Sequence, residues 1–321
     1  MLTRILITGA TGFIGSNLVR RLIGQNENNE VHILTRDSSN IWRIADIIKK
    51  IHNHSIDLLE AKKLKRVLTE IRPDYVFHLA NAGVYAGVSV SDKELVKVNF
   101  IGLINLISSL ERVNYKGFIN VGSSSEYGLK NKPIKENDLC DPINIYGISK
   151  LAASCYASFI ARSKDKPIIT LRLFSPFGPY DDHRRLISKL ILNLEENKEL
   201  ILINPDSVRD YIFVNDIIDL FLEAKDKANI LKGEIFNVAI GQECKISEIA
   251  NLIISIINPE IKVKWEISAS SFWEPKKWQA DMTKTFSSFD WRPHNSLKQG
   301  IDQTIKWFLK NKSLYKNFIK N

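Results

Sequence analysis

Three glycines spaced three residues apart, Gly9, Gly12 and Gly15, stand between two apolar segments at the start of the chain. Residues 5–7 are typical of a strand buried on both faces, and from Ser16 onward the apolar positions follow a helical period. In such a strand–turn–helix the first glycine permits a tight turn, the second lets backbone approach a pyrophosphate, and the third lets the helix pack on the strand. The helix N-terminus adds unpaired N–H groups that attract an anion. We therefore interpret these glycines as a dinucleotide-binding turn rather than a structural turn alone.

Strand-like and helix-like segments alternate after this turn. We expect helices at 60–71, 92–111 and 146–162, and strands at 31–34, 55–58, 74–80, 117–121 and 168–173. Repeated alternation of this kind predicts an α/β fold with a doubly wound parallel sheet of the Rossmann type. Such a sheet binds its ligand beyond the carboxyl ends of its strands, where the glycine turn, Arg36, Asp57 and Ala80 all fall.

The pattern changes after residue 173. A turn-rich segment at 175–179 is followed by expected elements at 186–196 and 200–202, while 214–228 and 234–238 are expected to return to the main sheet. We therefore expect a dinucleotide-binding domain of residues 1–173 to which 213–238 returns. The remainder, 174–212 and 239–321, would form a smaller C-terminal α/β substrate lobe, with helices at 246–257 and 297–309.

Composition narrows the classes of partner. The net charge is +9, but the basic residues are spread out, and the densest cluster, at 62–66, lies on an amphipathic segment typical of a solvated helix face, so we expect no nucleic-acid partner. No apolar run approaches the ~18 residues of a membrane span, so we expect no membrane partner. Three scattered cysteines without metal-ligand spacing, and no secretory signal, favour a cytoplasmic protein without a metal site.

The end of the second expected strand bears on the choice of cofactor. Where NAD is preferred, an acidic residue here binds the ribose 2′-hydroxyl, whereas a nearby arginine accommodates a 2′-phosphate. Thr35 occupies the expected position of the acid and Arg36 follows it, which favours NADP(H), with NAD(H) possible. Two alternatives stay open: Asp37 binds the hydroxyl, or Arg36 only stacks on the adenine.

Tyr146 and Lys150 stand one turn apart on an expected helix, so their side chains share a face. A phenol has a pKa near ~10, and a neighbouring ammonium lowers that pKa toward working pH. A serine-rich loop, residues 122–128, follows the fifth expected strand and can offer a hydroxyl to a substrate carbonyl or alcohol. Together these groups predict a catalytic site, against the alternatives of a surface pair and a solvated loop.

These motifs jointly resemble the extended short-chain dehydrogenase/reductase family, which acts largely on nucleotide sugars. The resemblance runs from residue 2 to about residue 308. Its matching parts are residues 8–15, Asp57, 78–80, Asn99, 122–128, Tyr146 with Lys150, 172–174, 208–214, 291–293 and 296–300.

The resemblance implies a role for each matching residue. Ser123 would bind the reacting oxygen, Tyr146 would be the general acid/base, and Lys150 would hold the nicotinamide ribose and lower the pKa of Tyr146. Asp57 would contact the adenine amine, and Arg209 would clamp the diphosphate of the sugar nucleotide. The expected cofactor-binding residues are Gly9, Thr11, Gly12, Phe13, Ile14, Gly15, Arg36, Asp57, Leu58, Leu79, Ala80, Asn99, Tyr146, Lys150 and Phe174. The expected substrate-binding residues are Ser124, Ser125, Ser175, Arg185 and Arg209.

Departures from the family pattern narrow the reaction. Family 4,6-dehydratases carry an acidic or polar residue and then Glu after the catalytic hydroxyl residue, where this chain has Ser124 and Ser125. Glu126 comes one residue late, so we expect its side chain to point elsewhere. Epimerase–reductases that act at two carbons need a cysteine in this loop, which has none.

Two substrate contacts of the family also differ in this chain. Ser175 stands where many members have Asn against the substrate phosphates. A second diphosphate-binding arginine is missing from residues 270–275, and Lys276, Lys277 or Arg185 would substitute for it.

Hydride chemistry at one carbon remains. We expect an NAD(P)-dependent oxidoreductase that reduces the 4-keto group of a nucleotide-linked 4-keto-6-deoxyhexose, because Arg36 suits an exchangeable NADPH. The alternative is a nucleotide-sugar 4-epimerase, which uses the same three catalytic groups and keeps NAD⁺ bound. A non-enzymatic dinucleotide sensor is a distant third, since such proteins usually lose the Tyr/Lys pair. We expect the enzyme to be a homodimer.

Overall fold

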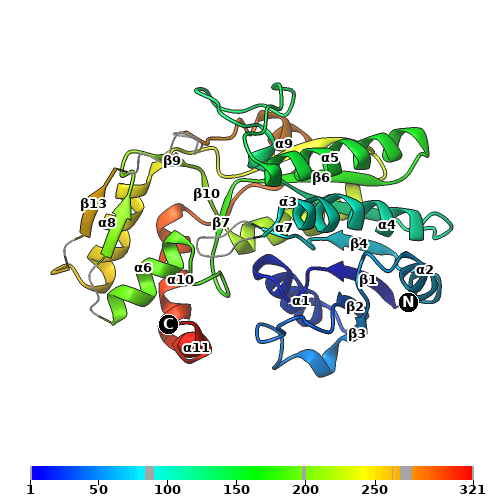
Figure 1. Cartoon of the computed structure of the whole chain (residues 1–321), viewed down its shortest axis with the longest axis horizontal. Helices are drawn as coiled ribbons and strands as arrows, with labels where there is room; N and C mark the ends of the chain where they lie inside the picture. Colours follow the sequence, from blue (N-terminus) through cyan, green and yellow to red (C-terminus); the bar gives the residue numbers. More distant parts are fainter. Residues whose placement is uncertain (1, 84–89, 197–199, 262, 268–276, 320–321) are drawn as a thin grey trace.

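A seven-stranded parallel sheet forms the larger part of the computed structural model, which describes residues 2–83, 90–196, 200–261, 263–267 and 277–319 (Figure 1). The strand order is β11-β6-β5-β4-β1-β2-β3. The strands are β1 (Thr3–Thr8), β2 (Asn29–Thr35), β3 (His52–Ser55), β4 (Tyr75–His78), β5 (Gly117–Ser123), β6 (Ile168–Leu173) and β11 (Ile235–Val238). The prediction of a doubly wound parallel sheet is confirmed.

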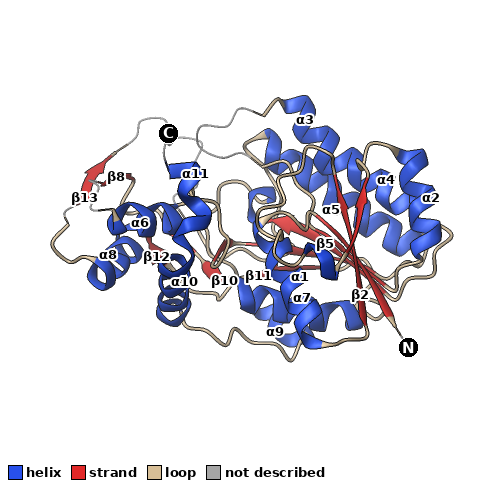
Figure 2. Cartoon of the chain, turned by 90° about the horizontal axis from the view of Figure 1, so that it is seen from below, coloured by secondary structure: helices blue, strands red, loops and turns tan. Residues whose placement is uncertain are grey.

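Helices cover both faces of this sheet (Figure 2). Because side chains alternate along a strand, Ile5 and Ile7 pack into one hydrophobic cluster and Leu6 into the other. The first cluster includes apolar side chains of α1 (Phe13–Gln25) and α7 (Val214–Lys227). The second includes those of α2 (Ala61–Ile71), α4 (Gly102–Ser109) and α5 (Ile145–Ser163). Burial on both faces explains the continuous apolar runs in the central strands.

Two predicted elements differ from the structure. The strand expected at 55–58 lies earlier, at His52–Ser55, where it pairs with His32–Thr35 of β2. An edge strand tolerates polar residues, and the apolar Ile56 and Leu58 instead pack inward from the loop beyond it. The helix expected at 92–111 is divided into α3 (Asp92–Val96), a π-helical turn (Lys97–Ile101) and α4.

A second group of elements lies beyond one end of the sheet (Figure 1). It contains α6 (Leu186–Glu195), α8 (Ile246–Ile257), α10 (Leu297–Asn311) and α11 (Lys316–Ile319), with β8 (Leu200–Ile203) paired to β13 (Val263–Glu266). We call this group the lobe. The expected helices at 186–196, 246–257 and 297–309 correspond to α6, α8 and α10, whereas β13 and α11 were not predicted.

Short strand pairs connect the lobe to the sheet. β7 (Ser175–Phe177) pairs with β10 (Tyr211–Phe213), and β9 (Val208–Arg209) pairs with β12 (Cys244–Lys245). The chain then returns through α7 to β11, which pairs with β6, and α9 (Thr283–Ser288) packs on β11. The residue boundaries of the two domains stay a prediction. None of the described helices is both long and apolar enough to cross a membrane.

Candidate active site

Two adjoining cavities lie at the carboxyl ends of the strands, where a doubly wound sheet binds its ligand. The smaller measures about 180 Å³ and the larger about 590 Å³, and both are lined by Gly9, Gly12, Leu79 and Asn81. The smaller is also lined by Thr8, Thr11, Leu34, Thr35, Arg36, Ser39, Ile56, Asp57, Leu58, Leu59, Ala80 and Val98. The larger is also lined by Phe13, Ile14, Gly15, Val121, Gly122, Ser123, Ser124, Ser125, Asn144, Tyr146, Lys150, Leu173, Phe174, Ser175, Pro176, Arg185 and Trp278.

The glycine turn separates the two cavities and fits a pyrophosphate. Gly9 has a φ of +72°, and a Cβ there would lie 2.5 Å from the Ala80 backbone nitrogen. A Cβ at Gly15 would lie 2.2 Å from the Gly9 carbonyl oxygen, so neither position tolerates a side chain. Gly12 has no comparable backbone clash, and as the N-cap of α1 it offers no side chain to the first N–H groups of that helix. These N–H groups are therefore available to an anion.

The smaller cavity presents Arg36 without an acidic partner among the described residues. Thr35 Oγ1 donates to Asn53 Oδ1 at 2.8 Å, and the Ser55 hydroxyl donates to the Asp37 carboxylate. Asp37, the alternative ligand of the ribose hydroxyl, and Thr35 are thus both bonded to residues of β3, whereas Arg36 is exposed at the cavity. The local backbone is fixed because the Arg36 N–H donates to Ser39 Oγ at 2.9 Å. An exposed guanidinium at this position is chemically suited to an anionic group of a ligand.

The larger cavity brings together the three residues predicted to be catalytic, Ser123, Tyr146 and Lys150. Helix α5 begins where the Asn144 side chain accepts a hydrogen bond from the Gly147 N–H at 2.8 Å. A Cβ at Gly147 would lie 2.4 Å from the Ser125 carbonyl oxygen. The start of the helix therefore packs directly on the serine loop, and this contact places the tyrosine and the serine in one cavity.

Lys150 is a buried cation. Only 4% of the residue is exposed, and its Nζ donates to the Val121 carbonyl oxygen. Burial lowers the pKa of Lys150 to about 8, an effect that the Glu126 carboxylate opposes. Nearby, burial and the Lys150 charge lower the pKa of His78 to about 3, so that ring is neutral at physiological pH. Its Nδ1 lies 2.8 Å from Thr8 Oγ1, which in turn accepts from the Ala80 N–H at 3.2 Å.

The serine loop has a defined hydrogen-bond pattern. Ser123 Oγ accepts from the Ser125 N–H at 3.2 Å, which leaves the hydroxyl proton for a substrate oxygen. The Ser123 N–H donates to Glu126 Oε1 at 2.8 Å, and Arg172 Nε donates to Glu126 Oε2 at 2.7 Å. Glu126 is fully buried in this ion pair and is not among the residues that line the larger cavity. The expectation that its side chain points elsewhere is confirmed.

Asn99 is not brought to either cavity. The residue is 1% exposed, its Oδ1 accepts from the Ala82 N–H at 2.7 Å, and its Nδ2 donates to the Ala82 carbonyl and Ser149 Oγ, both at 3.0 Å. The π-helical turn aims this amide at the loop after β4. In this structure Asn99 connects that loop to Ser149, the residue before Lys150, and the cofactor contact expected of it stays a prediction.

The predicted diphosphate-binding arginines occupy different positions. Arg185 lines the larger cavity, with its guanidinium carbon 5.8 Å from the centre of the Phe13 ring and its Nη1 donating to Asp181 Oδ1 at 3.1 Å. Arg209 is 7% exposed and is not a lining residue; its guanidinium carbon lies 5.2 Å from the centre of the Trp278 ring. Trp278 does line the larger cavity. It therefore connects the lining of this cavity with Arg209, the residue predicted to bind the substrate diphosphate.

Sequence reasoning missed Asn81, Asn144 and Trp278 as lining residues. Asn144 carried a usable signal, since an Asn directly before a helical segment is a favourable N-cap. Nothing local distinguished Asn81. The backbone N–H of Trp278 donates to the Val208 carbonyl at 3.0 Å, so Trp278 is positioned by a contact between distant parts of the chain.

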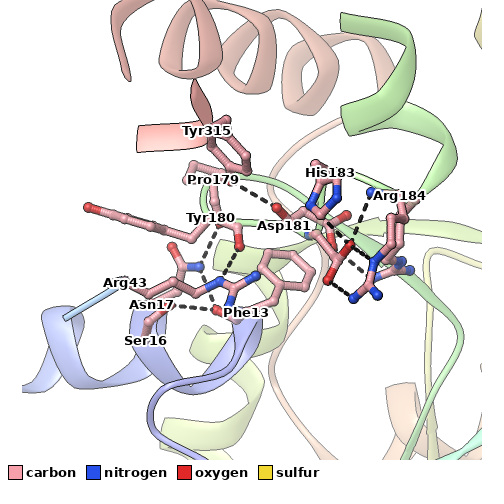
Figure 3. A network of polar contacts seen from close by, with 12 residues as sticks. Phe13, Ser16, Asn17, Arg43, Pro179, Tyr180, Asp181, His183, Arg184 and Tyr315 are labelled. Atoms are coloured by element: carbon pink, nitrogen blue, oxygen red, sulfur yellow. Dashed lines mark hydrogen bonds and ion pairs between the residues drawn. The ribbon is translucent and has the colours of Figure 1, made fainter. Parts of the chain in front are cut away.

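A polar network fastens the lobe side of the site to the glycine turn (Figure 3). Asn17 Nδ2 on α1 donates to the Pro179 carbonyl at 2.8 Å. Arg43 Nε donates to the Tyr180 carbonyl at 2.8 Å, and its Nη1 donates to the Thr11 carbonyl at 3.4 Å. The Tyr315 hydroxyl donates to the Asp181 carbonyl at 2.8 Å. The segment that carries Arg185 is thereby positioned relative to the cofactor turn.

Comparisons with known proteins agree with this geometry. The sequence model of the NAD dependent epimerase/dehydratase family matches residues 5–239. Human dTDP-D-glucose 4,6-dehydratase is 26% identical over 99% of this chain and 93% of its own length. UDP-glucose 4-epimerase of Mycolicibacterium smegmatis is 26% identical over 97% of this chain and 99% of its own length.

Among solved structures, UDP-glucose 4-epimerase of Thermotoga maritima with UDP-glucose superposes with a TM-score of 0.88, at 26% identity, over 97% of this chain and 100% of that one. The family match covers well over half of the sequence and includes the glycine turn, the serine loop and the Tyr146–Lys150 pair. The chain is therefore an enzyme of the NAD dependent epimerase/dehydratase family, the nucleotide-sugar branch of the extended short-chain dehydrogenases/reductases.

Proposed function

We propose that this enzyme reduces the 4-keto group of a nucleotide-linked 4-keto-6-deoxyhexose, with NADPH as the favoured reductant. One observation carries the proposal: the larger cavity gathers Ser123, Tyr146 and Lys150, and none of its described lining residues is Asp, Glu or Cys. Hydride transfer at a single carbon needs a proton donor, a cation and a hydroxyl. It needs neither the additional carboxylic acid of a dehydratase nor the thiol of a double epimerase.

Each of the three residues has a distinct task in this reaction. A bound nicotinamide dinucleotide would supply the hydride. Ser123 donates its hydroxyl proton in a hydrogen bond to the carbonyl oxygen, because its own oxygen already accepts from the loop. Tyr146 gives its phenolic proton to the oxygen that becomes the alcohol. Lys150 stabilises the resulting phenolate by its charge, which is held at the end of β5 by Val121.

The remaining site residues are proposed to bind the two nucleotides. We assign Asp57 to the adenine amine, Arg36 to the 2′-phosphate and the glycine turn to the pyrophosphate of the cofactor. Arg185 and Ser175 would contact the substrate diphosphate and Ser124 and Ser125 the sugar, since all four line the larger cavity. Arg209 would reach the diphosphate from beside Trp278.

A 4-epimerase is the second candidate, and the likeness to UDP-glucose 4-epimerases in sequence and structure supports it. The same three residues serve both reactions, so the cofactor discriminates between them. The human relative is a dTDP-D-glucose 4,6-dehydratase. Dehydration is less favoured for this chain because Ser124 and Ser125 line the cavity, whereas Glu126 is buried against Arg172.

The discriminating experiment has two parts. The purified enzyme is denatured and the released nucleotides are separated by chromatography; it is then assayed with NADPH and freshly prepared 4-keto-6-deoxyhexose nucleotides. Stoichiometric oxidation of NADPH with consumption of the ketosugar would support the reductase. Stoichiometric NAD⁺ in the denatured sample, with interconversion of a UDP-hexose and its 4-epimer without added cofactor, would establish the epimerase. Activity of either kind would exclude a mere dinucleotide sensor.

We also propose that the enzyme is a cytoplasmic homodimer that pairs through α4 and α5. Phe159 on α5 is 63% exposed, Ile101 directly before α4 is 38% exposed, and the ring centres of Phe100, in the π-helical turn before α4, and Tyr156 on α5 lie 6.2 Å apart. A contiguous exposed apolar patch marks a protein interface, and the proposal takes these residues to belong to one. Light scattering should give twice the chain mass, and Phe159→Glu should give a monomer; a monomeric wild-type protein would contradict the assignment.

A further inference from the structure

We propose that Glu126 is a positioning residue of the active site, whose buried carboxylate fixes the backbone of Ser123 and balances the charges of Lys150 and Arg172 beneath the larger cavity. The inference deepens the proposed function and rests on the roles given there to Ser123, Tyr146 and Lys150. Glu126 itself is not a lining residue and would not touch the substrate.

Both carboxylate oxygens of Glu126 are committed. Oε1 accepts from the Ser123 N–H and Oε2 from Arg172 Nε, so one side chain connects the end of β5 to β6. Gly122 makes the space for this contact, because a Cβ there would lie 2.7 Å from Glu126 Oε1 and 2.9 Å from Arg172 Cγ. A side chain at Gly122 would collide with the Glu126–Arg172 ion pair, which explains why a glycine precedes the three serines.

Arg172 is itself held in place, so the carboxylate has little freedom to move. Its guanidinium carbon lies 4.5 Å from the centre of the Tyr127 ring. The Tyr127 hydroxyl donates to Asn237 Oδ1 at 2.7 Å, and Asn237 Nδ2 donates to the Ile134 carbonyl at 2.8 Å. The ion pair therefore belongs to a buried network that extends from the serine loop to β11.

Among the described residues around Lys150, Lys150 itself and Arg172 are buried cations and Glu126 is a buried carboxylate. Lys150 is bonded to Val121, two residues before the serine that Glu126 holds, and Arg172 pairs with Gly122 in the next strand. Glu126 is the carboxylate that acts on Lys150. The other ionisable groups near this region are His78 from β4, whose pKa burial lowers to about 3, and Tyr127 and the Cys140 thiol, whose pKa values burial raises, so all three are neutral at physiological pH.

The charge of Glu126 has a predictable effect on the titration of Lys150. Burial lowers the pKa of Lys150 and Glu126 raises it, so removal of the carboxylate charge lowers that pKa below about 8. Lys150 then loses its proton at a lower pH. Because the cation assists Tyr146, the alkaline limit of turnover should move to lower pH in parallel.

The test compares Glu126→Gln with Glu136→Gln. Glu136 is the control because it is a half-buried carboxylate that also accepts from a backbone N–H, that of Asn237 at 2.8 Å, but it is not among the residues that line the larger cavity. The titration of Lys150 is followed by NMR of ¹³C-labelled lysine, with Lys150→Met to assign the resonance. We expect Glu126→Gln to lower the Lys150 midpoint by about one pH unit or more, as for loss of a close opposite charge. Glu136→Gln should leave the midpoint unchanged.

Glu126→Asp separates charge from position, and covers the case in which Glu126→Gln fails to fold. The aspartate keeps the charge but is too short for both hydrogen bonds, so the Lys150 midpoint should stay near that of the wild type while kcat falls. Two results would overturn the inference. The first is a folded Glu126→Gln variant whose Lys150 midpoint equals that of the wild type, and the second is a Glu126→Asp variant whose midpoint falls as far as expected for loss of the charge. The titration of Lys150 requires no substrate, so it tests the role of Glu126 independently of the reaction. If the midpoint shifts as expected but the enzyme does not reduce ketosugars, the role of Glu126 is supported and the proposed reaction is not.

Discussion

Replacement of Gly147 by alanine tests whether the start of α5 is as tightly seated on the serine loop as the structure indicates. The new Cβ would lie 2.4 Å from the Ser125 carbonyl oxygen and 2.9 Å from Pro142 Cβ, where ordinary contact begins near 3.4 Å. The helix start or the loop must therefore move by about 1 Å. Both obstacles are backbone or ring atoms, which cannot rotate away as the tip of a flexible side chain does.

Two opposing effects set the magnitude for Gly147→Ala. Overpacking costs about 1–3 kcal/mol. The higher helix propensity of alanine relative to glycine stabilises the folded state by at most about 1 kcal/mol. We expect a net loss of about 1–2 kcal/mol in the free energy of unfolding. Because Tyr146 precedes the substitution and the displaced loop carries Ser123, turnover should suffer more, by about 10²-fold for a misplacement of this size.

The assays are urea unfolding followed by circular dichroism and steady-state turnover with saturating cofactor. Gly24→Ala is the matched control, since it makes the same chemical change in helix α1, where a Cβ would meet no atom within 4 Å. That variant should gain about 0.4–1 kcal/mol and keep its activity. A Gly147→Ala enzyme as stable and as active as the Gly24→Ala enzyme would refute the close contact and the positioning argument built on it.

Three further predictions concern charge and proton transfer. Tyr146→Phe should still bind cofactor, measured by fluorescence titration, but lose about 10²–10⁴ in turnover, and Ser123→Ala should lose less because only one hydrogen bond is removed. Arg36→Ala should raise KM for NADPH well above any change for NADH, since a charge-assisted contact contributes about 1.5–3 kcal/mol; equal effects on both cofactors would contradict the 2′-phosphate assignment. Burial raises the pKa of Asp181 from 3.8 to about 6 against the opposing effect of Arg185, so its contribution to stability is greatest below pH 4 and is lost as pH rises toward 6. The free energy of unfolding of the wild type minus that of Asp181→Asn should therefore fall from pH 4 to pH 6, since the effects of the other carboxyls cancel in this difference; parallel pH dependences of the two proteins would contradict the assignment.

The parts of the fold that could be predicted are those encoded by local periodicity. The strands buried on both faces are continuous apolar runs, and the glycine turn can be identified from a few neighbouring residues. The parallel sheet and its ligand-binding edge could therefore be predicted from the sequence. The strand at His52–Ser55 was misplaced because it is a polar edge strand beside an apolar loop, Ile56–Leu58. The two- and three-residue strands that join the lobe, such as β7 and β9, have no periodicity to detect.

The candidate site divides along a similar line. Residue types and spacing were enough to select Ser123, Tyr146 and Lys150, which the structure brings to one cavity. The same reasoning placed Asn99 among the cofactor ligands, because spacing does not reveal that a π-helical turn aims its amide at Ala82 and Ser149. Nor could it show what Glu126 contacts, since Arg172 is 46 residues away along the chain.

The three proposed catalytic side chains owe their arrangement to contacts between residues far apart in the sequence. Lys150 reaches from α5 to the Val121 carbonyl, Gly147 brings α5 against Ser125, and Glu126 joins the serine loop to β6. Each contact uses backbone groups or the buried end of a side chain. The Ser123 hydroxyl proton is thus left to the substrate. A scaffold of this kind keeps the geometry of hydride transfer constant while the residues that line the cavity vary. The reaction of this chain is therefore inferred from side chains such as Arg36, Ser124 and Ser125 rather than from its fold.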